Sequence, residues 1–216
     1  MSDSLVNLII ILSKIAVVQV VLLTAVAYSV YAERRVSAFI QNRIGPNRVG
    51  PAGLFQPIVD AVKLLLKEDI VPANANRFIH SLAPSISIIV SLSTFAVIPF
   101  GDTITIGDKV IKLQIADVNI GILYFLAMTS LGVYGVTLSG WSSNNKYSLL
   151  GGLRSSAQTI SYELSMGLAV LAIILMNGSL ELDNIVQSQA GWKWNIILQP
   201  VGFIIFLVSA FAETNR

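Results

Sequence analysis

The stretch LVNLIIILSKIAVVQVVLLTAVAYSVY, residues 5–31, decides the fold of this chain, and it contains one charged residue, Lys14. A bilayer is crossed by about 20 apolar helical residues, so this stretch is long enough to form a spanning helix. A secretory signal has a shorter apolar core followed by a small-residue cleavage site, and neither feature is evident. We therefore predict a first transmembrane helix, with Lys14 reaching toward the outer interface.

The rest of the chain has the same character. Of its 216 residues, 54% are hydrophobic and 12% are charged, and the mean hydropathy is +0.73. This composition is typical of a membrane protein. Four further apolar segments approach or exceed the spanning length: residues 78–100, 119–141, 155–176 and 195–212. The predicted fold is an all-α polytopic membrane protein with five transmembrane helices, forming a single membrane domain over residues 1–216.

The chain has no cysteine and one histidine, His80. Disulfides are therefore excluded, and so are iron–sulfur clusters, which cysteine thiolates normally hold. A bis-histidine haem is excluded as well. The net charge of +2 is too small to suggest nucleic-acid binding. We expect no covalent or metal-ligated cofactor, so that in any electron transfer the electrons come from another subunit.

Lysine and arginine are distributed unevenly between the two sides of the predicted membrane. With the N-terminus outside, ten of them fall on the inside and three on the outside. Those inside are Arg34, Arg35, Arg43, Arg48, Lys63, Lys67, Arg77, Lys146, Arg154 and Arg216, and those outside are Lys109, Lys112 and Lys193. The positive-inside rule thus predicts this orientation. A small hairpin over residues 102–114, turning at Gly107-Asp108, is predicted on the outside.

A rigid elbow and a charged helix separate the first two spans. Two Gly-Pro dipeptides, at residues 45–46 and 50–51, break any helix, because proline removes a backbone donor and glycine permits positive φ. An amphipathic helix is predicted over residues 54–69, with Asp60 and Lys63 on its polar face and able to pair. Two interpretations stay open: a helix resting on lipid headgroups, or a helix that walls a cavity at the membrane surface.

Three acidic residues, Glu33, Glu163 and Glu213, come from three predicted helices on the cytoplasmic side. Glu163 lies about 12 Å from Ser155, the predicted start of its span, at 1.5 Å per residue. A carboxylate at such a depth is costly and usually faces a bundle interior or a water path. We predict that the three acids share a wet cavity. The alternative is separate structural roles, with Glu163 bonded to a hydroxyl neighbour and Glu213 capping a helix.

Several motifs occur in order along the whole chain. They are Glu33-Arg34-Arg35, the run from Gln41 to Asn47, the run from Val49 to Pro57, Asp60-Ala61-x-Lys63-Leu64, Lys67-Glu68, Asn144-Asn145-Lys146-Tyr147, Ser161-Tyr162-Glu163 and Ala212-Glu213-Thr214-Asn215-Arg216. Together they closely resemble the H subunit of the respiratory complex I family, known as subunit 1 in mitochondria. Because the motifs are independent, their agreement is more specific than any one of them.

The resemblance implies a membrane subunit of proton-translocating NADH:quinone oxidoreductase, a translocase whose substrate is ubiquinone or menaquinone. The residues that would border the quinone-access chamber are Arg34, Asp60 and Lys63, with Glu33, Lys67 and Glu68 nearby. Glu163 and Glu213 match acids of the proton path that leads from the chamber into the membrane arm.

By the same resemblance, FMN and the iron–sulfur clusters belong to partner subunits. The implied partners are the quinone-site and terminal iron–sulfur subunits of the hydrophilic arm, small membrane subunits, and the lipid bilayer. The implied location is the bacterial plasma (inner) membrane or, alternatively, an organelle inner membrane. Family members usually have about eight spans and continue with an acidic loop and about three more spans, so this chain, which stops at Arg216, is expected to be truncated at its C-terminus.

Three rival functions stay open. Membrane-bound hydrogenases and complexes using ferredoxin or another donor contain homologous subunits without quinone. A stand-alone ion transporter could use Glu163 and Glu213, although no inverted repeat is evident. A passive scaffold is the third rival, and it would have no need of an acid at Glu163.

Overall fold

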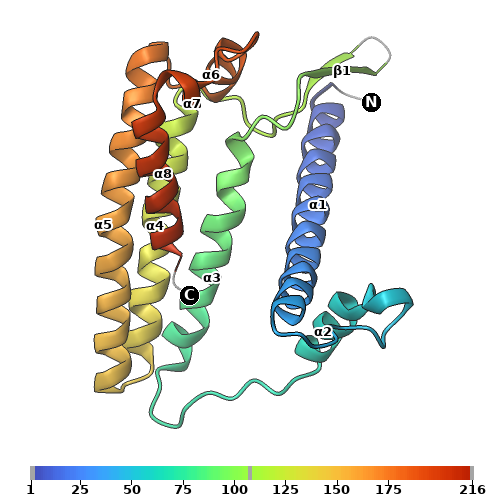
Figure 1. Ribbon diagram of the computed structural model, residues 1–216, viewed down its shortest axis with the longest axis vertical. Coiled ribbons are helices and arrows are strands. Elements are labelled where there is room, and N and C mark those ends of the chain that lie inside the picture. The colour runs from blue at the N-terminus through green and yellow to red at the C-terminus, as the bar shows by residue number, and fades with distance from the viewer. Residues whose placement is uncertain (1–2, 107–108, 215–216) are drawn as a thin grey trace. The chain divides into compact units, whose positions relative to one another are not determined.

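The computed structural model describes residues 3–106 and 109–214 and consists mainly of α-helices (Figure 1). In this part of the chain, four helices are long and apolar enough to cross a membrane: Leu5–Ile40, Arg77–Val97, Gly121–Ser142 and Lys146–Asn177, with a shorter apolar helix at Pro200–Glu213. The prediction of an all-α polytopic membrane protein is confirmed. The chain packs as two compact units, Met1–Ile70 and Val71–Arg216. The single membrane domain over residues 1–216 stays a prediction.

The first unit is built on helix α1, Asp3–Ile40, which is longer than the predicted span of residues 5–31. The helix continues because residues 32–40 contain neither glycine nor proline, and the first left-handed residue is Asn42, with φ 55°. Its 38 residues extend over about 57 Å, compared with roughly 30 Å for the hydrocarbon core of a bilayer. The charged turn at residues 33–35 can therefore lie outside the hydrocarbon.

Helix α2, Gln56–Leu65, follows the elbow and is shorter than the predicted helix over residues 54–69. Pro57 lies in its first turn, where proline costs no hydrogen bond. At the end of the helix, Leu64, Leu65 and Leu66 are 71–85% exposed. α2 folds back onto α1, which makes the first unit compact by itself.

The second unit contains three long helices: α3, Arg77–Thr94, continued by the 3₁₀ turn η2, Phe95–Val97; α4, Gly121–Ser142; and α5, Lys146–Asn177. α3 packs on α4, and α4 packs on α5 (Figure 1). The Asn76 side chain caps α3 by accepting from two backbone N–H groups of its first turn. Gly140 and Gly152 allow α4 and α5 to approach closely, since a Cβ on Gly140 would lie 3.2 Å from Gly152 Cα.

The loop expected between residues 141 and 155 is mostly helical, and that part of the prediction is wrong. α4 runs to Ser142, and α5 begins at Lys146. Asn145 starts α5 by accepting a hydrogen bond from Tyr147 N at 2.9 Å, so the helix begins well before its apolar run. Glu163 consequently lies 17 residues after the helix start, about 26 Å along the axis instead of about 12 Å.

A two-stranded hairpin connects α3 to α4. Strand β1, Thr103–Ile106, pairs antiparallel with β2, Lys109–Lys112, as predicted for residues 102–114. The predicted turn residues Gly107 and Asp108 lie outside the described residues. After β2, Lys112 Nζ lies 2.6 Å from Asp117 Oδ2, which ties the hairpin to the chain leading into α4.

The last predicted span, residues 195–212, is broken in two. α7 covers Asn195–Leu198 and α8 covers Pro200–Glu213. Pro200 has no N–H and disfavours helical backbone in the residue before it, and Gln199 accordingly has φ −134° and ψ 66°. α8 packs along α5.

A short helix, α6, Leu182–Ser188, lies at the end of the bundle where α5 finishes (Figure 1).

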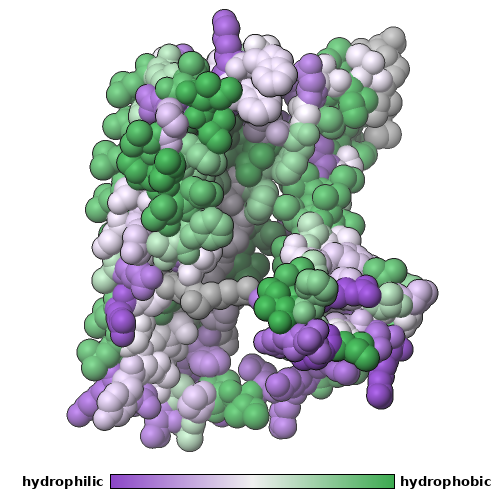
Figure 2. Space-filling model, viewed as in Figure 1, coloured by the Kyte–Doolittle hydropathy of each residue, from purple (hydrophilic) through white to green (hydrophobic). Residues whose placement is uncertain are grey.

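The outer surface of this bundle suits a bilayer. Leu168 and Leu175 of α5 and Val201 and Phe211 of α8 are 68–75% exposed. Figure 2 shows hydrophobic residues over the α5 and α8 face and hydrophilic residues gathered at the lower end of the bundle. This pattern is expected of helices that face lipid with their sides.

Candidate functional site

An ion pair joins the end of α1 to α2. Arg34 Nη1 lies 2.5 Å from Asp60 Oδ2, and Gln56 Nε2 donates to Asp60 Oδ1 at 2.8 Å. The hydrogen bond from Gln56 and the charge of Arg34 hold the pKa of the Asp60 carboxyl below its ordinary value of 3.8, and Lys63 adds to the effect through its charge. We call Arg34, Gln56, Asp60 and Lys63 the α1–α2 charge cluster.

The cluster brings together the three residues predicted to border a chamber. Asp60 is bonded to Arg34 and Gln56, whereas the sequence had offered Lys63 on the same helix as a possible partner. The planar guanidinium of Arg34 reaches across from α1 and matches carboxylate geometry better than an ammonium does.

Tyr31 and Arg35 fasten the elbow to α1 beside this cluster. Tyr31 Oη donates to Ala52 O at 2.7 Å, and Arg35 Nη1 donates to Tyr31 Oη at 2.6 Å. The Arg35 guanidinium carbon also lies 5.7 Å from the Tyr31 ring centroid. The charged groups are thus presented by packed elements, which hold a site more accurately than a free loop.

The elbow itself is tightly closed. Gly53 N donates to Gly50 O and Phe55 N donates to Val49 O, both at 3.2 Å. Gly53 has φ 78°, and a Cβ at this position would lie 2.3 Å from Pro46 O. Glycine is therefore required here by both the backbone conformation and the available space.

The other predicted chamber residues lie in different settings. Glu33 precedes Arg34 on α1. Lys67 and Glu68 follow the end of α2, so they are not on the helix to which they were assigned. Their position beside a chamber stays a prediction.

The low pKa of Asp60 predicts that the docking of α2 on α1 depends on pH. A carboxyl whose pKa is lower in the folded state stabilises the fold above its unfolded value of 3.8, and this contribution is lost as pH falls through the folded value. Hydrogen-exchange protection of α2, corrected for intrinsic rates, should hold from neutral pH to about pH 4 and then decrease. Asp60→Asn should remove this dependence and Asp69→Asn should retain it. Equal behaviour of the two variants would contradict the assignment.

A second polar group lies between α4 and α5. Ser130 Oγ lies 2.5 Å and Thr129 Oγ1 3.1 Å from Glu163 Oε1. The same two hydroxyls lie 3.0 and 2.9 Å from Leu126 O. We call Leu126, Thr129, Ser130 and Glu163 the α4–α5 hydroxyl cluster. The sequence analysis offered a hydrogen bond between Glu163 and a neighbouring hydroxyl group as an alternative, and this bond is present. A carboxyl group held in this way can still take up a proton.

Glu213 lies near this cluster. α8 ends beside the middle of α5, where Gln158 Nε2 donates to Ala212 O at 3.2 Å. Glu213 is close enough to Glu163 for the two carboxyl groups to interact electrostatically. The structure thus brings together two of the three acids predicted to share a cavity. Glu33 belongs to the first unit, so its share in that cavity stays a prediction.

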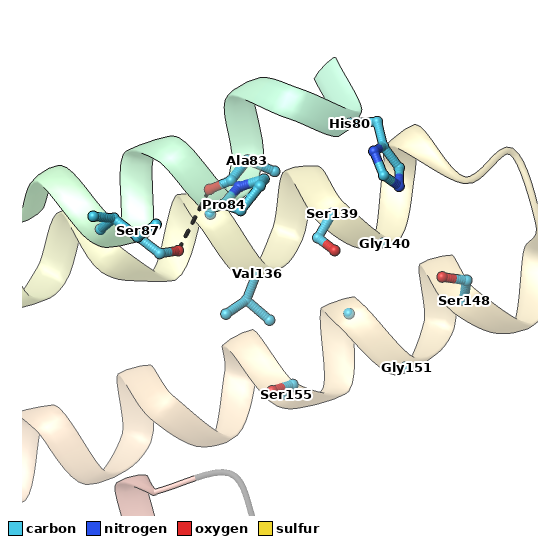
Figure 3. A pocket seen from close by; sticks show the side chains of 13 residues that line it. His80, Ala83, Pro84, Ser87, Val136, Ser139, Gly140, Ser148, Gly151 and Ser155 are labelled. Atoms are coloured by element: carbon cyan, nitrogen blue, oxygen red, sulfur yellow. Dashed lines mark hydrogen bonds between the residues drawn. The ribbon is translucent and has the colours of Figure 1, made fainter. Parts of the chain in front are cut away.

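A cavity of about 640 Å³ opens between α3, α4 and α5, toward the end where α5 begins. Its lining includes His80, Ser139, Ser148 and Ser155, and Figure 3 shows His80 at one end of it. Most of the lining is apolar, and the serine hydroxyl groups and the His80 imidazole are its polar parts. Among the described residues, no group of three acidic or histidine side chains is placed to hold a metal ion.

Sequence reasoning missed Gln56, Tyr31, Thr129 and Ser130. Gln56 could have been found from its spacing, because it lies four residues before Asp60 on the same helix face. Two adjacent hydroxyl residues within an apolar span were also a usable signal, since polar groups there seek partners on facing helices. Tyr31 gave no such signal, because its partner is a backbone carbonyl in the elbow.

These features define a polytopic α-helical membrane protein with a charge cluster at the end of its first helix and a hydroxyl-bonded acid within a later one. The chain belongs to the NADH dehydrogenase family, whose family model matches residues 13–216.

Three relatives show how close the similarity is. The chain is 56% identical over 204 residues to NADH-quinone oxidoreductase subunit 8 of Rhodothermus marinus, a match that covers 93% of this chain and 57% of the relative. It is 53% identical over 189 residues to the H 1 subunit of the same enzyme in Cytophaga hutchinsonii, covering 88% and 55%. It is 53% identical over 205 residues to the H 1 subunit of Geobacter metallireducens, covering 95% and 62%. The resemblance to the H subunit of complex I is confirmed, and the chain spans 55–62% of the length of these relatives.

Proposed function

We propose that this chain acts in a proton-translocating NADH:quinone oxidoreductase, where it lines the quinone-access chamber and links quinone reduction to the proton path. The observation that carries the proposal is the Arg34–Asp60 ion pair, which fixes charged groups on packed elements at the end of a spanning helix. The residues assigned to the chamber are Arg34, Asp60 and Lys63, with Glu33, Lys67 and Glu68 nearby. The relatives are named as subunits of NADH-quinone oxidoreductase, which supports the place of this chain in such an enzyme.

The cluster suits a chamber where negative charge develops. Reduction of a quinone takes up electrons and then protons, so a reduced, unprotonated quinone is anionic. Arg34 and Lys63 would attract such an anion, and Asp60, whose pKa is lowered, would stay ionised and keep Arg34 in place. A chain without cysteine supplies the cavity and its charges, while FMN and iron–sulfur clusters lie in the partner subunits of the hydrophilic arm.

Glu163 and Glu213 are assigned to the proton path. Because the charge of Glu163 acts on the Glu213 carboxyl, a change of charge on Glu163 alters the proton affinity of Glu213. The orientation that goes with this proposal is the N-terminus outside, in a bacterial plasma membrane, on the basis of the lysine and arginine distribution.

The rival functions differ in their partners. Copurification with iron–sulfur subunits would separate a component of an oxidoreductase or hydrogenase from a stand-alone transporter or a scaffold. Sensitivity of electron transfer to quinone-site inhibitors would then separate a quinone-linked complex from a hydrogenase. The names of the relatives favour quinone.

The proposal is tested by quinone-reductase activity of the assembled complex carrying Asp60→Ala together with Lys63→Ala. We expect quinone turnover to fall roughly 10- to 100-fold, because a small displacement of positioning groups has a large effect on rate. Activity with an artificial acceptor that bypasses the chamber should be retained, and assembly is checked on a native gel.

A matched control is available in the hairpin. Lys112 and Asp117 also form an ion pair, so Lys112→Ala with Asp117→Ala removes the same residue types elsewhere. This control should keep full quinone turnover. Full turnover in the Asp60/Lys63 variant as well would leave α2 as a helix resting on lipid headgroups and remove the chamber assignment.

A further inference from the structure

Ser130 and Thr129 each face two hydrogen-bond acceptors at once. Each hydroxyl lies within bonding distance of Glu163 Oε1 and of Leu126 O. A hydroxyl group carries one hydrogen, so it can donate to one of these oxygens at a time. The geometry therefore provides two alternative hydrogen-bond arrangements for the same set of heavy atoms.

The first arrangement suits an ionised Glu163. A carboxylate is an acceptor only, and each of its oxygens has two lone pairs. Ser130 and Thr129 can then both donate to Oε1, at 2.5 and 3.1 Å. Two charge-assisted hydrogen bonds would offset part of the cost of a carboxylate between two membrane helices.

The second arrangement suits a protonated Glu163. Its O–H must now find an acceptor, and Ser130 Oγ is the nearest one at 2.5 Å. Ser130 can accept this hydrogen bond if its own hydrogen turns to Leu126 O, at 3.0 Å. Thr129 can continue to donate to Oε1. Every donor keeps a partner, and only the Ser130 hydrogen rotates.

We propose that Ser130 and Thr129 are positioning residues that let Glu163 gain and lose a proton while its contact with α4 is maintained, with Leu126 O as the alternative acceptor. The inference rests on the proposed place of Glu163 on a proton path and adds to it a specific device for proton exchange. It makes Ser130 the more important of the two, because it is closer to Oε1.

The surroundings of Glu163 leave few other groups to perform this task. Residues 121–142 of α4 contain no Asp, Glu, Lys, Arg or His, and Tyr124 Oη donates to Ser93 O of α3. From α8, Glu213 interacts with Glu163 and contributes negative charge. Asp183 of α6 lies at the far end of α5, where Ser188 donates to Asn177.

The test is a pH titration of the assembled complex by infrared difference spectroscopy, with Ser130→Ala compared with wild type. The band of the protonated Glu163 carboxyl is assigned by its absence in Glu163→Gln. Without the Ser130 hydroxyl the ionised form loses a donor, so the pH midpoint of this band should rise by on the order of one unit. Thr129→Val should produce a smaller rise, and the two substitutions together a larger one.

Two variants show that the effect belongs to the hydroxyl. Ser130→Thr restores a hydroxyl and should restore the midpoint, which a purely structural role of Ser130 would not explain. Ser161→Ala removes a hydroxyl of α5 that donates to Ala157 O, and it should leave the midpoint unchanged. If Ser130→Ala assembles poorly, Ser130→Cys keeps the shape with a weak donor and should give a shift in the same direction.

The outcomes separate this inference from the function on which it rests. An unchanged midpoint in the Thr129→Val/Ser130→Ala double variant overturns the hydroxyl device, even where Glu163→Gln abolishes proton translocation. Normal translocation in Glu163→Gln overturns the proton path itself, whatever the Ser130 variants do to the carboxyl band. A midpoint shift with rescue by Ser130→Thr supports the device.

Discussion

Replacing Gly53 with alanine is expected to make the elbow between α1 and α2 open more often and to reduce quinone turnover by the assembled complex. A left-handed backbone costs a residue with a Cβ roughly 1–2 kcal/mol, and Gly53 has φ 78°. The new Cβ would also lie 2.3 Å from Pro46 O, a backbone atom that cannot rotate away. Moving that backbone adds about 1–3 kcal/mol. The elbow should therefore open on the order of a hundredfold more often.

Hydrogen exchange measures this opening directly, because the amides of residues 53 and 55 donate two of the hydrogen bonds within the elbow. Gly191→Ala is the matched control. Gly191 has φ 72° but no atom within 4 Å of the position that a Cβ would occupy, so alanine there meets only the conformational cost. A Gly53 variant with wild-type protection at residue 55 would show that the elbow tolerates displacement, and the proposed rigid support of the charge cluster would be lost.

The general architecture could be predicted because it depends on composition and length. Apolar runs of spanning length lead directly to membrane helices, and a Gly-Asp dipeptide between two short runs rich in β-branched residues predicts a hairpin. The ends of the helices were harder to predict, since each depends on a single residue. Asn145 caps α5 before its apolar run begins, and Pro200 splits a run that is otherwise continuous. A hydropathy profile averages over many residues, so it shows neither the cap at Asn145 nor the break at Pro200.

In the candidate site, the charged residues could be predicted from the sequence, whereas their contacts could not. Arg34, Asp60 and Lys63 were found because they occur in motifs, whereas the bond between Arg34 and Asp60 depends on how α2 folds back onto α1. Glu163 was found because an acid in an apolar run is conspicuous. Its partners, Thr129 and Ser130, lie more than 30 residues away in the sequence and become its neighbours only through the packing of α4 on α5.

Glu163→Gln is expected to reduce coupled proton translocation on the order of a hundredfold, the typical contribution of a positioned proton-transferring side chain. Glutamine keeps an acceptor for the Ser130 and Thr129 hydroxyls, so the contact between α4 and α5 should persist. It has no proton to exchange near neutral pH, so the path through Glu163 would be interrupted while the fold remains. The measurement is proton uptake by proteoliposomes during quinone reduction, with assembly verified by native gel.

Glu181→Gln provides the matched control for this prediction. Glu181 precedes α6 and accepts a hydrogen bond from Asn184, so the same substitution removes a carboxyl outside the hydroxyl cluster. Its proton translocation should equal that of wild type. If Glu163→Gln translocates protons equally well, the hydroxyl bonds to Glu163 would have a structural role only. This is the alternative that the sequence analysis left open. If translocation is lost in Glu163→Gln alone, the ionisable carboxyl between α4 and α5 is needed for translocation, because glutamine retains its shape and its acceptor for the two hydroxyl groups.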